Sequence, residues 1–304
     1  MRKRPILFGC IFFFAIVLVL ILAISITSSW DTIGGKNFMS RRSNHVAVVF
    51  VKGVMVDPKH VMDTIIAYRK NPKVKAVVIR VESPGGTVGT AQEIYREILK
   101  LKKEKPTVAS LGNVAASGGY YVASACDRIV ANPGTVTGSI GVIIELTNFE
   151  QLLKWAKIKS EVIKSGDYKD MGSPLRDLKE EERALLKDFV DNVHDQFVRA
   201  VAEGREMSHQ DVSRLATGMI FSGEQALEKG LVDELGNLQD AIDIAAKLAG
   251  IEDEPEVIYP PKRRPSVMDL IFGGNDYDNY KQRFIDSNIH VMYLWQTFAL
   301  GEEL

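Results

Sequence analysis

Ser117 lies where a strand is expected to turn into a helix. It follows an apolar, partly β-branched run at residues 108–114 and precedes the small and aromatic residues of 120–126. Small neighbours, with Gly118 directly after the serine, leave room for a substrate, and the unpaired N–H groups of a helix start can stabilise an oxyanion. The pattern AASGG is a degenerate relative of the GxSxG nucleophile elbow and points to acyl transfer, although a plain N-cap serine is the structural alternative.

A serine nucleophile needs a base, and no histidine of this chain suits that role. The five histidines are His45, His60, His194, His209 and His290. His194 flanks the apolar stripe of a long expected helix, where a packed residue is the more common interpretation. A lysine can serve instead when its neutral amine accepts the serine proton. Lys169 is the candidate because it lies in a Gly-bounded polar loop, although an exposed loop lysine is the ordinary case.

Gly85 and Gly86 are a third candidate for a role in catalysis, and they follow an expected buried strand at 74–81. Glycine permits positive φ and a close approach of backbone, as a peptide-binding or oxyanion-holding loop requires. A tight strand-to-helix turn would need the same residues. The surrounding SPGGTVG lacks the Gly-Lys-Ser/Thr of a phosphate loop, so we exclude nucleotide binding.

Composition limits the classes of function. The chain has 304 residues, of which 46% are apolar and 25% charged, with a net charge of −1. These values are typical of a globular protein with a sizeable core, and a mixed charge without a basic patch argues against nucleic-acid binding. Cys10 and Cys126 lie in very different contexts and predict neither a disulfide nor a metal site. We expect no cofactor.

The N-terminal segment predicts a membrane anchor. Residues 5–29 carry no charge and follow the basic cluster at 2–4. A bilayer needs about 20 apolar residues, whereas the apolar region of a cleaved signal peptide is about 7–15 residues long. We therefore expect an uncleaved anchor within residues 1–29. Basic residues on its two sides are nearly balanced, but the compact N-terminal cluster favours a cytoplasmic N-terminus and an exported remainder.

The rest of the chain divides into a polar linker at 30–45, a folded domain at 46–250 and a C-terminal tail of uncertain order at 251–304. Strands are expected at 46–51, 74–81, 108–114, 128–131, 139–144 and 161–163. Helices are expected at 61–68, 87–103, 120–126, 149–156, 221–236 and 237–250. This alternation predicts an α/β fold with a parallel sheet and right-handed crossovers.

The longest helix is expected to start at Asp177, which with Glu180 forms an Asp version of the capping box. Apolar residues then recur every four positions, which predicts one buried face. These residues are Leu185, Phe189, Val193, Phe197 and Val201. No motif is recognisable in the tail after Pro265.

The motifs together are more specific than any one of them. An N-terminal anchor, SPGG, GNVAASGGYY, TVTGSIGV and SGDYKDMGSP follow one another in this order. Over about residues 46–248 the chain resembles the signal peptide peptidase A family in its short, single-domain form. The resemblance implies a Clp protease/crotonase-like fold of parallel ββα units and a Ser-Lys catalytic dyad. The implied roles are Ser117 as nucleophile, Lys169 as general base, Ser139 orienting the lysine, and Gly118 with Gly85 or Gly86 as the oxyanion hole.

The resemblance also implies a function and partners. We expect a single-pass cell-membrane serine endopeptidase, with its catalytic domain outside the cytoplasm, that degrades remnant signal peptides and other unstructured hydrophobic peptides. A homo-oligomer whose sites lie at subunit interfaces is implied as well. Two alternatives remain open: a crotonase-like acyl-CoA enzyme, which needs neither serine nucleophile nor anchor, and an inactive membrane scaffold of the same fold.

Overall fold

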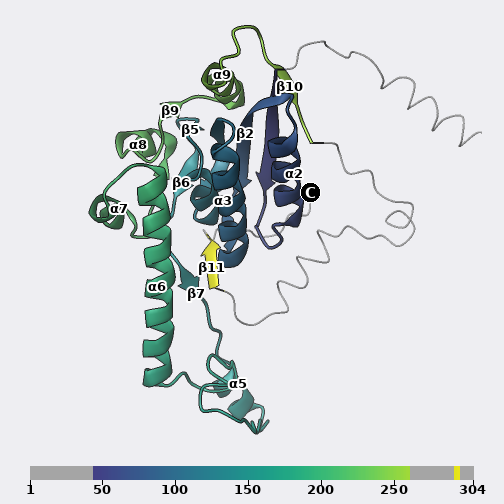
Figure 1. Ribbon diagram of the computed structural model, residues 1–304. Helices are drawn as coiled ribbons and strands as arrows, with labels where there is room; N and C mark the ends of the chain where they lie inside the picture. Colours follow the sequence, from purple (N-terminus) through teal and green to yellow (C-terminus); the bar gives the residue numbers. More distant parts are fainter. Residues whose placement is uncertain (1–43, 261–290, 295–304) are drawn as a thin grey trace, which may run out of the picture. The chain divides into compact units, whose positions relative to one another are not determined.

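A computed structural model of the chain describes residues 44–260 and 291–294 (Figure 1). The expected anchor at 1–29 lies outside the described residues, as does nearly all of the expected linker. Within the described ranges no helix is both long and apolar enough to cross a bilayer. The first strand of the described residues is His45–Lys52, where a strand was expected.

A parallel sheet forms the centre of the fold, in the strand order β10-β1-β2-β4-β5-β9. Every neighbouring pair along this path is parallel, which confirms the predicted α/β class. The strands are β1 (His45–Lys52), β2 (Val74–Ser83), β4 (Thr107–Ala116), β5 (Arg128–Ala131), β9 (Glu234–Leu235) and β10 (Glu256–Ile258). The first half of β4 pairs with β5, and its second half pairs with β6 (Val136–Gly138). β6 also pairs antiparallel with β8 (Ile220–Ser222).

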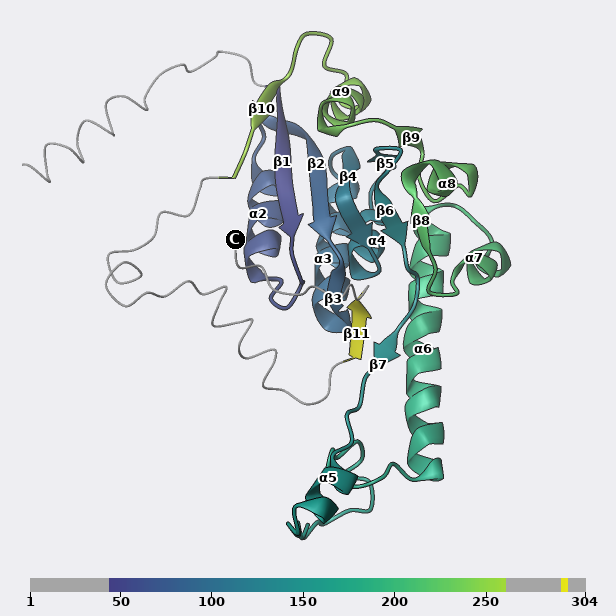
Figure 2. The ribbon, with the colours of Figure 1, turned by 180° about the vertical axis from the view of Figure 1, so that it is seen from behind.

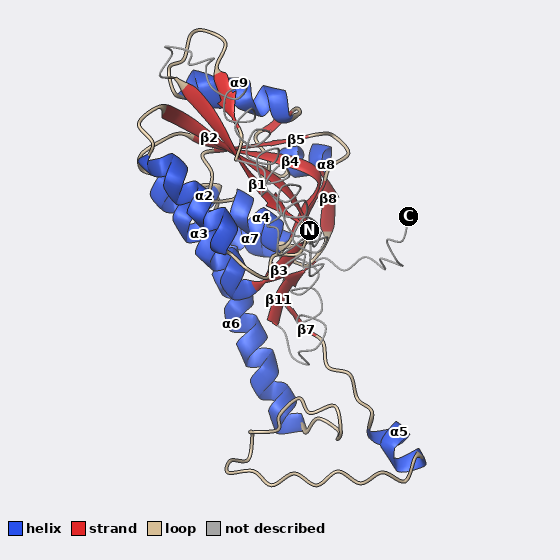
Figure 3. Cartoon of the chain, turned by 90° about the vertical axis from the view of Figure 1, so that its right-hand side faces the viewer, coloured by secondary structure: helices blue, strands red, loops and turns tan. Residues whose placement is uncertain are grey.

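Helices cover both faces of this sheet, as its apolar strands require. Successive strand residues point to opposite faces, so Val46 and Val48 pack with α9 (Leu238–Leu248), whereas Ala47 and Val49 belong to a larger cluster on the other side. The helices of that side are α2 (Lys59–Lys70), α3 (Val88–Lys102), α4 (Gly118–Ala123) and part of α6 (Glu180–Gly204). Figure 3 shows the strands between α9 and the pair α2 and α3.

Three expected elements differ from the structure. In place of the helix expected at 221–236, the chain forms β8, the short helix α8 (Gly223–Glu228) and β9. The helix starts only after Ser222, whose hydroxyl accepts a capping hydrogen bond from the Gln225 N–H. It ends before Gly230, where a φ of 73° turns the chain. Of the strand expected at 139–144 only β7 (Ile143–Ile144) forms. Residues 161–163 are exposed and form no strand, since no neighbouring strand pairs with them.

The long helix α6 begins at Glu180, three residues after the predicted start. The N–H of Lys179 donates to Glu182 Oε2 over 3.0 Å, so the capping interaction involves this pair and not Asp177 with Glu180. The apolar stripe is buried only in its second half, at Val193, Phe197 and Val201, whereas Leu185 and Phe189 are about half exposed. The short α5 (Glu150–Trp155) and its flanking loops lie at the exposed end of α6 (Figure 1).

A second, three-stranded sheet has the order β3-β11-β7. Its strands are β3 (Gly85–Thr87), β11 (Val291–Leu294) and β7. β11 comes from the C-terminal part of the chain and runs antiparallel to both neighbours (Figure 2). Gly86 pairs with Tyr293, and Ile143 pairs with Met292.

Candidate active site

Ser117 occupies a strained turn between β4 and α4. Its φ of 54° lies in the region that non-glycine residues rarely adopt, with ψ at −117°. Backbone hydrogen bonds hold this conformation, because the Ser117 N–H donates to Gly138 O and the Ser117 carbonyl accepts from Tyr121 N–H, each over 2.8 Å. Such strain costs about 1–3 kcal/mol and is typical of functional sites.

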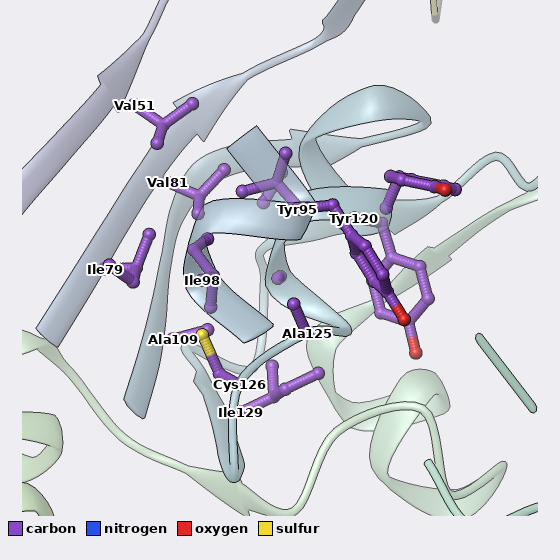
Figure 4. Close-up of a cluster of buried hydrophobic side chains, with 14 of the residues drawn as sticks. Val51, Ile79, Val81, Tyr95, Ile98, Ala109, Tyr120, Ala125, Cys126 and Ile129 are labelled. Atoms are coloured by element: carbon purple, nitrogen blue, oxygen red, sulfur yellow. The ribbon is translucent and has the colours of Figure 1, made fainter. Parts of the chain in front are cut away.

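The helix after Ser117 is anchored in the core. All six residues of α4 are buried, and the Tyr120 hydroxyl donates to Leu231 O over 2.8 Å. Figure 4 shows Tyr120 among the side chains of this cluster. Burial raises the pKa of the adjacent Tyr121 hydroxyl to about 12, so it stays neutral at physiological pH. A Cβ at Gly119 would meet Ser83 O at 2.7 Å, which explains the glycine there.

Gly85 and Gly86 have different backbone surroundings. Gly85 has φ 112°, and its N–H already donates to the buried Ser83 Oγ over 3.1 Å. A Cβ at Gly86 would meet Met55 O at 2.1 Å, so only glycine fits. Since Gly118 is the first residue of α4, its N–H has no acceptor within the helix. Gly86 pairs with Tyr293 of β11, so of these glycines Gly118 has the N–H that is best placed to stabilise an oxyanion.

Ser139 lies close to Ser117 in the fold. It follows β6 with φ 50°, and its N–H donates to Met219 O over 2.7 Å. Ser117 and Ser139 are 1% and 7% exposed and line the same cavity. Because Gly138 accepts the Ser117 N–H, the turn before Ser139 supports the turn at Ser117 directly.

This cavity beside the two serines has a volume of about 450 Å³. Apolar side chains make part of its wall, and α6 adds two polar residues, Asp191 and His194. The sequence analysis did not identify Asp191, and it rejected His194 as a base. Only the helical spacing of these two residues from the buried Val193 and Phe197 could have indicated that α6 forms part of the cavity wall. Among the described residues the Ser117 hydroxyl has no hydrogen-bond partner.

Lys169 lies apart from this cavity within one chain. It is exposed, in the segment between α5 and α6, where its N–H donates to Gly166 O over 3.1 Å in a turn. It is not among the residues that line the cavity. The structure thus brings together Ser117, Ser139 and the glycines, and it leaves Lys169 elsewhere on the same chain. Its role stays a prediction.

An extended strand already lies beside the site. β11 occupies the space between β3, which carries Gly86, and β7, whose Ile143 also lines the cavity. Both flanking strands pair with it through their backbone. The arrangement can therefore hold an extended peptide near a strained serine and the Gly118 N–H, which has no acceptor within its helix. Its chemistry is that of acyl transfer from a peptide carbonyl.

Comparison with known proteins agrees with this geometry. The model of peptidase family S49 matches residues 99–252, about half of the chain. A Synechocystis protein with a provisional protease name is 47% identical over 66% of this chain and 73% of its own length. Protease 4 of Salmonella typhi is 32% identical over 74% of this chain but only 38% of its own length. The chloroplastic serine protease SPPA of Arabidopsis thaliana is 35% identical over 73% of this chain and 34% of its own length. The chain belongs to peptidase family S49, the family of signal peptide peptidase A.

Proposed function

We propose that this protein is a membrane-anchored serine endopeptidase with a Ser-Lys dyad in a Clp protease/crotonase-like fold. The observation that carries the proposal is the strained, nearly buried Ser117 at the start of α4, facing a cavity that Ser139 and Ile143 of β7 also line. Family membership supplies the peptidase class.

Catalysis would proceed in two steps. Ser117 Oγ attacks the peptide carbonyl carbon while its proton passes to the neutral amine of Lys169, and the N–H groups of Gly118 and of either Gly85 or Gly86 stabilise the oxyanion. As the C–N bond breaks, the lysine returns the proton to the leaving amine and an acyl-enzyme remains. Water then attacks the ester with the same lysine as base. Ser139, next to Ser117, would orient the lysine amine.

Lys169 would come from a neighbouring protomer. It is remote from the cavity of its own chain, and the surfaces around it are unusually apolar for solvent-exposed surfaces. Exposed apolar side chains of this region and of α6 are Phe149, Leu152, Trp155, Ile158, Val162, Ile163, Tyr168, Leu175, Leu185 and Phe189. Trp155 is 82% exposed and Ile163 96%. A homo-oligomer that covers these side chains and pairs each Ser117 with a partner lysine satisfies both features.

The substrates would be extended and apolar. β3 and β7 accept a strand between them, so a substrate would bind by strand addition and place its carbonyl near Ser117. Folded proteins cannot supply such a strand, whereas remnant signal peptides and other unstructured hydrophobic segments can. With the uncharged segment at 5–29 as a single-pass anchor, the N-terminus would face the cytoplasm and the peptidase domain would act outside it.

Labelling with a fluorophosphonate tests the proposal. We expect covalent modification of Ser117 and its loss in Ser117→Ala, with labelling retained in Ser124→Ala, a matched control at the other end of α4. A crotonase-like acyl-CoA enzyme or an inactive scaffold would remain unmodified at Ser117. An intact, assembled protein that resists labelling would therefore contradict the proposed function.

A further inference from the structure

A cluster of charged side chains connects the turn that carries Lys169 to the first turn of α6. Asp170 follows Lys169 directly in the chain and is 13% exposed, although most of its neighbours in the loop are exposed. Arg176 is 26% exposed, and the Glu182 side chain is fully buried. Glu182 belongs to α6, so the cluster joins a loop to a helix.

Arg176 contacts both carboxylates in the bidentate manner that only a guanidinium allows. Its Nε and Nη2 donate to the two Asp170 oxygens over 2.9 and 3.0 Å. Its Nη1 and Nη2 donate to the two Glu182 oxygens over 2.8 and 2.6 Å. Lys164 Nζ donates to Asp170 Oδ1 over 2.6 Å, so the Asp170 carboxylate is held from two sides. A lysine at position 176 would reproduce at most part of this geometry.

The backbone near Lys169 is held by the same groups. Arg176 Nη2 also donates to Asp170 O over 3.1 Å. Lys164 Nζ donates to Asp167 O over 2.7 Å. These two contacts lie on either side of Lys169, where the neighbouring backbone hydrogen bonds are the turn contacts of Lys169 N–H with Gly166 O and of Met171 N–H with Tyr168 O. A long loop without such contacts would be mobile, which is incompatible with a lysine that must reach a hydroxyl within hydrogen-bond distance.

We propose that Arg176, with Asp170 and Glu182, is a positioning device that fixes the Lys169 turn on the end of α6 so that the amine can meet Ser117 of the partner subunit. This inference rests on the proposed Ser-Lys function. α6 suits the role because its other half forms the cavity wall at Val190 and His194. One rigid helix thus carries, at its start, the lysine turn that would serve a neighbouring protomer and, further along, a wall of the serine cavity of its own chain.

Steady-state kinetics of assembled Arg176→Ala and Asp170→Asn proteins with a hydrophobic peptide tests the proposal. We expect kcat to fall about 10–100-fold, because a small misplacement of a catalytic group has effects of this size. KM should stay within about twofold, since neither residue lines the cavity beside Ser117. Backbone amide hydrogen exchange around Lys169 should become faster in both variants.

Arg183→Ala is the matched control, because Arg183 lies at the same end of α6 and, among the described residues, forms its ion pair with the exposed Glu180. It should leave kcat unchanged. If Lys169→Ala abolishes turnover while Arg176→Ala and Asp170→Asn keep kcat within twofold, the positioning role is wrong and the dyad stands. If Lys169→Ala itself retains turnover, the dyad and this inference both fail. If both variants lose activity only when they also lose the native particle size, the cluster serves assembly and the proposal is overturned.

Discussion

At the scale of single residues, the reactive groups are distinguished by conformation more than by residue type. Ser117 and Ser139 both have positive φ, at 54° and 50°, and each N–H donates to a backbone carbonyl that holds it there. An ordinary N-cap serine has extended backbone and accepts a hydrogen bond from the helix, as Ser208 does from Asp211 at the start of α7 (His209–Leu215). Ser117 makes no such capping bond, which favours a chemical role over a capping role.

Substitution of either member of the dyad is expected to abolish peptide hydrolysis. Ser117→Ala removes the nucleophile and Lys169→Ala the base, so each should lower kcat by several orders of magnitude, and the double variant should be hardly worse than either single one. The measurement is kcat on a peptide substrate with the assembled protein. His194→Gln is the control, because His194 lines the cavity yet has no part in a Ser-Lys mechanism. Loss of turnover in His194→Gln, with near-normal turnover in Lys169→Ala, would identify histidine as the base.

At the scale of elements, an ion pair connects the end of α6 to the loop before β9. Arg205 Nη1 and Nη2 donate to the Asp233 carboxylate over 2.9 and 2.8 Å, and the Ile129 N–H donates to it over 2.7 Å. Both side chains are largely buried, at 7% and 14% exposed. Burial by itself would raise the pKa of Asp233, but hydrogen bonds and the Arg205 charge hold that pKa below its ordinary value of 3.8.

Asp233→Asn is expected to destabilise the fold by about 3–5 kcal/mol at neutral pH, because it leaves the buried Arg205 charge unpaired. Since the folded-state pKa of Asp233 is depressed, the stabilisation is present above its unfolded-state value near 3.8 and is lost as pH falls through the folded-state value. The free energy of unfolding in urea at pH 7 and pH 3 measures both effects. The difference between wild type and Asp233→Asn should narrow at the lower pH. A difference equal at both pH values, or matched by the exposed Asp188→Asn control, would contradict this account.

β11 and a substrate are expected to compete for the same edges. Met292 pairs with both Thr87 and Ile143, so Met292→Pro removes a backbone donor at the middle of the small sheet. If β11 hinders peptide binding, this variant should have a KM several-fold lower with unchanged kcat. Met292→Ala keeps the backbone donor and should resemble the wild type. An unchanged KM in Met292→Pro would contradict competition between β11 and the substrate.

At the scale of the whole molecule, a single chain has neither a complete proposed dyad nor a fully covered apolar surface. The cavity beside Ser117 lacks the predicted lysine, and α5, its loops and the first half of α6 expose apolar side chains that no described part of the chain covers. Assembly with further copies would complete both. The proposed oligomer is therefore a condition for activity and not only for stability.

Mixing of inactive variants tests assembly across chains. A chain beginning near residue 41 should keep the sheet from β1 onward. Ser117→Ala and Lys169→Ala forms of it, unfolded and reassembled together in equal amounts, should regain about a quarter of wild-type activity, because random cyclic assembly pairs an intact serine with an intact neighbouring lysine at that fraction of interfaces. Each variant reassembled alone is the control. A mixture of native particle size that stays inactive would show that the dyad forms within one chain.

Local pattern was sufficient to predict much of the fold. The β-branched runs at 46–51, 74–81 and 108–114 became parallel strands of the sheet, because each is apolar enough to be buried on both faces. The strand-to-helix turn at Ser117 was predictable from AASGG alone. Periodicity was not sufficient where short elements depend on distant partners. The sequence at 221–236 alone does not reveal that Phe221, in β8, pairs with Thr137 of β6.

For the candidate site, too, some features follow from the sequence alone and others only from the tertiary structure. Residue type and order in the chain determined which groups are able to react: a serine among small residues, a glycine pair after a strand and a lysine in a Gly-bounded loop. Tertiary structure decided what lies beside them. It placed Ser139 and α6 around the Ser117 cavity, engaged the Gly85 N–H with Ser83, and inserted β11 between β3 and β7. These contacts join residues far apart in the sequence, and burial and backbone hydrogen bonding select them only when the whole chain packs.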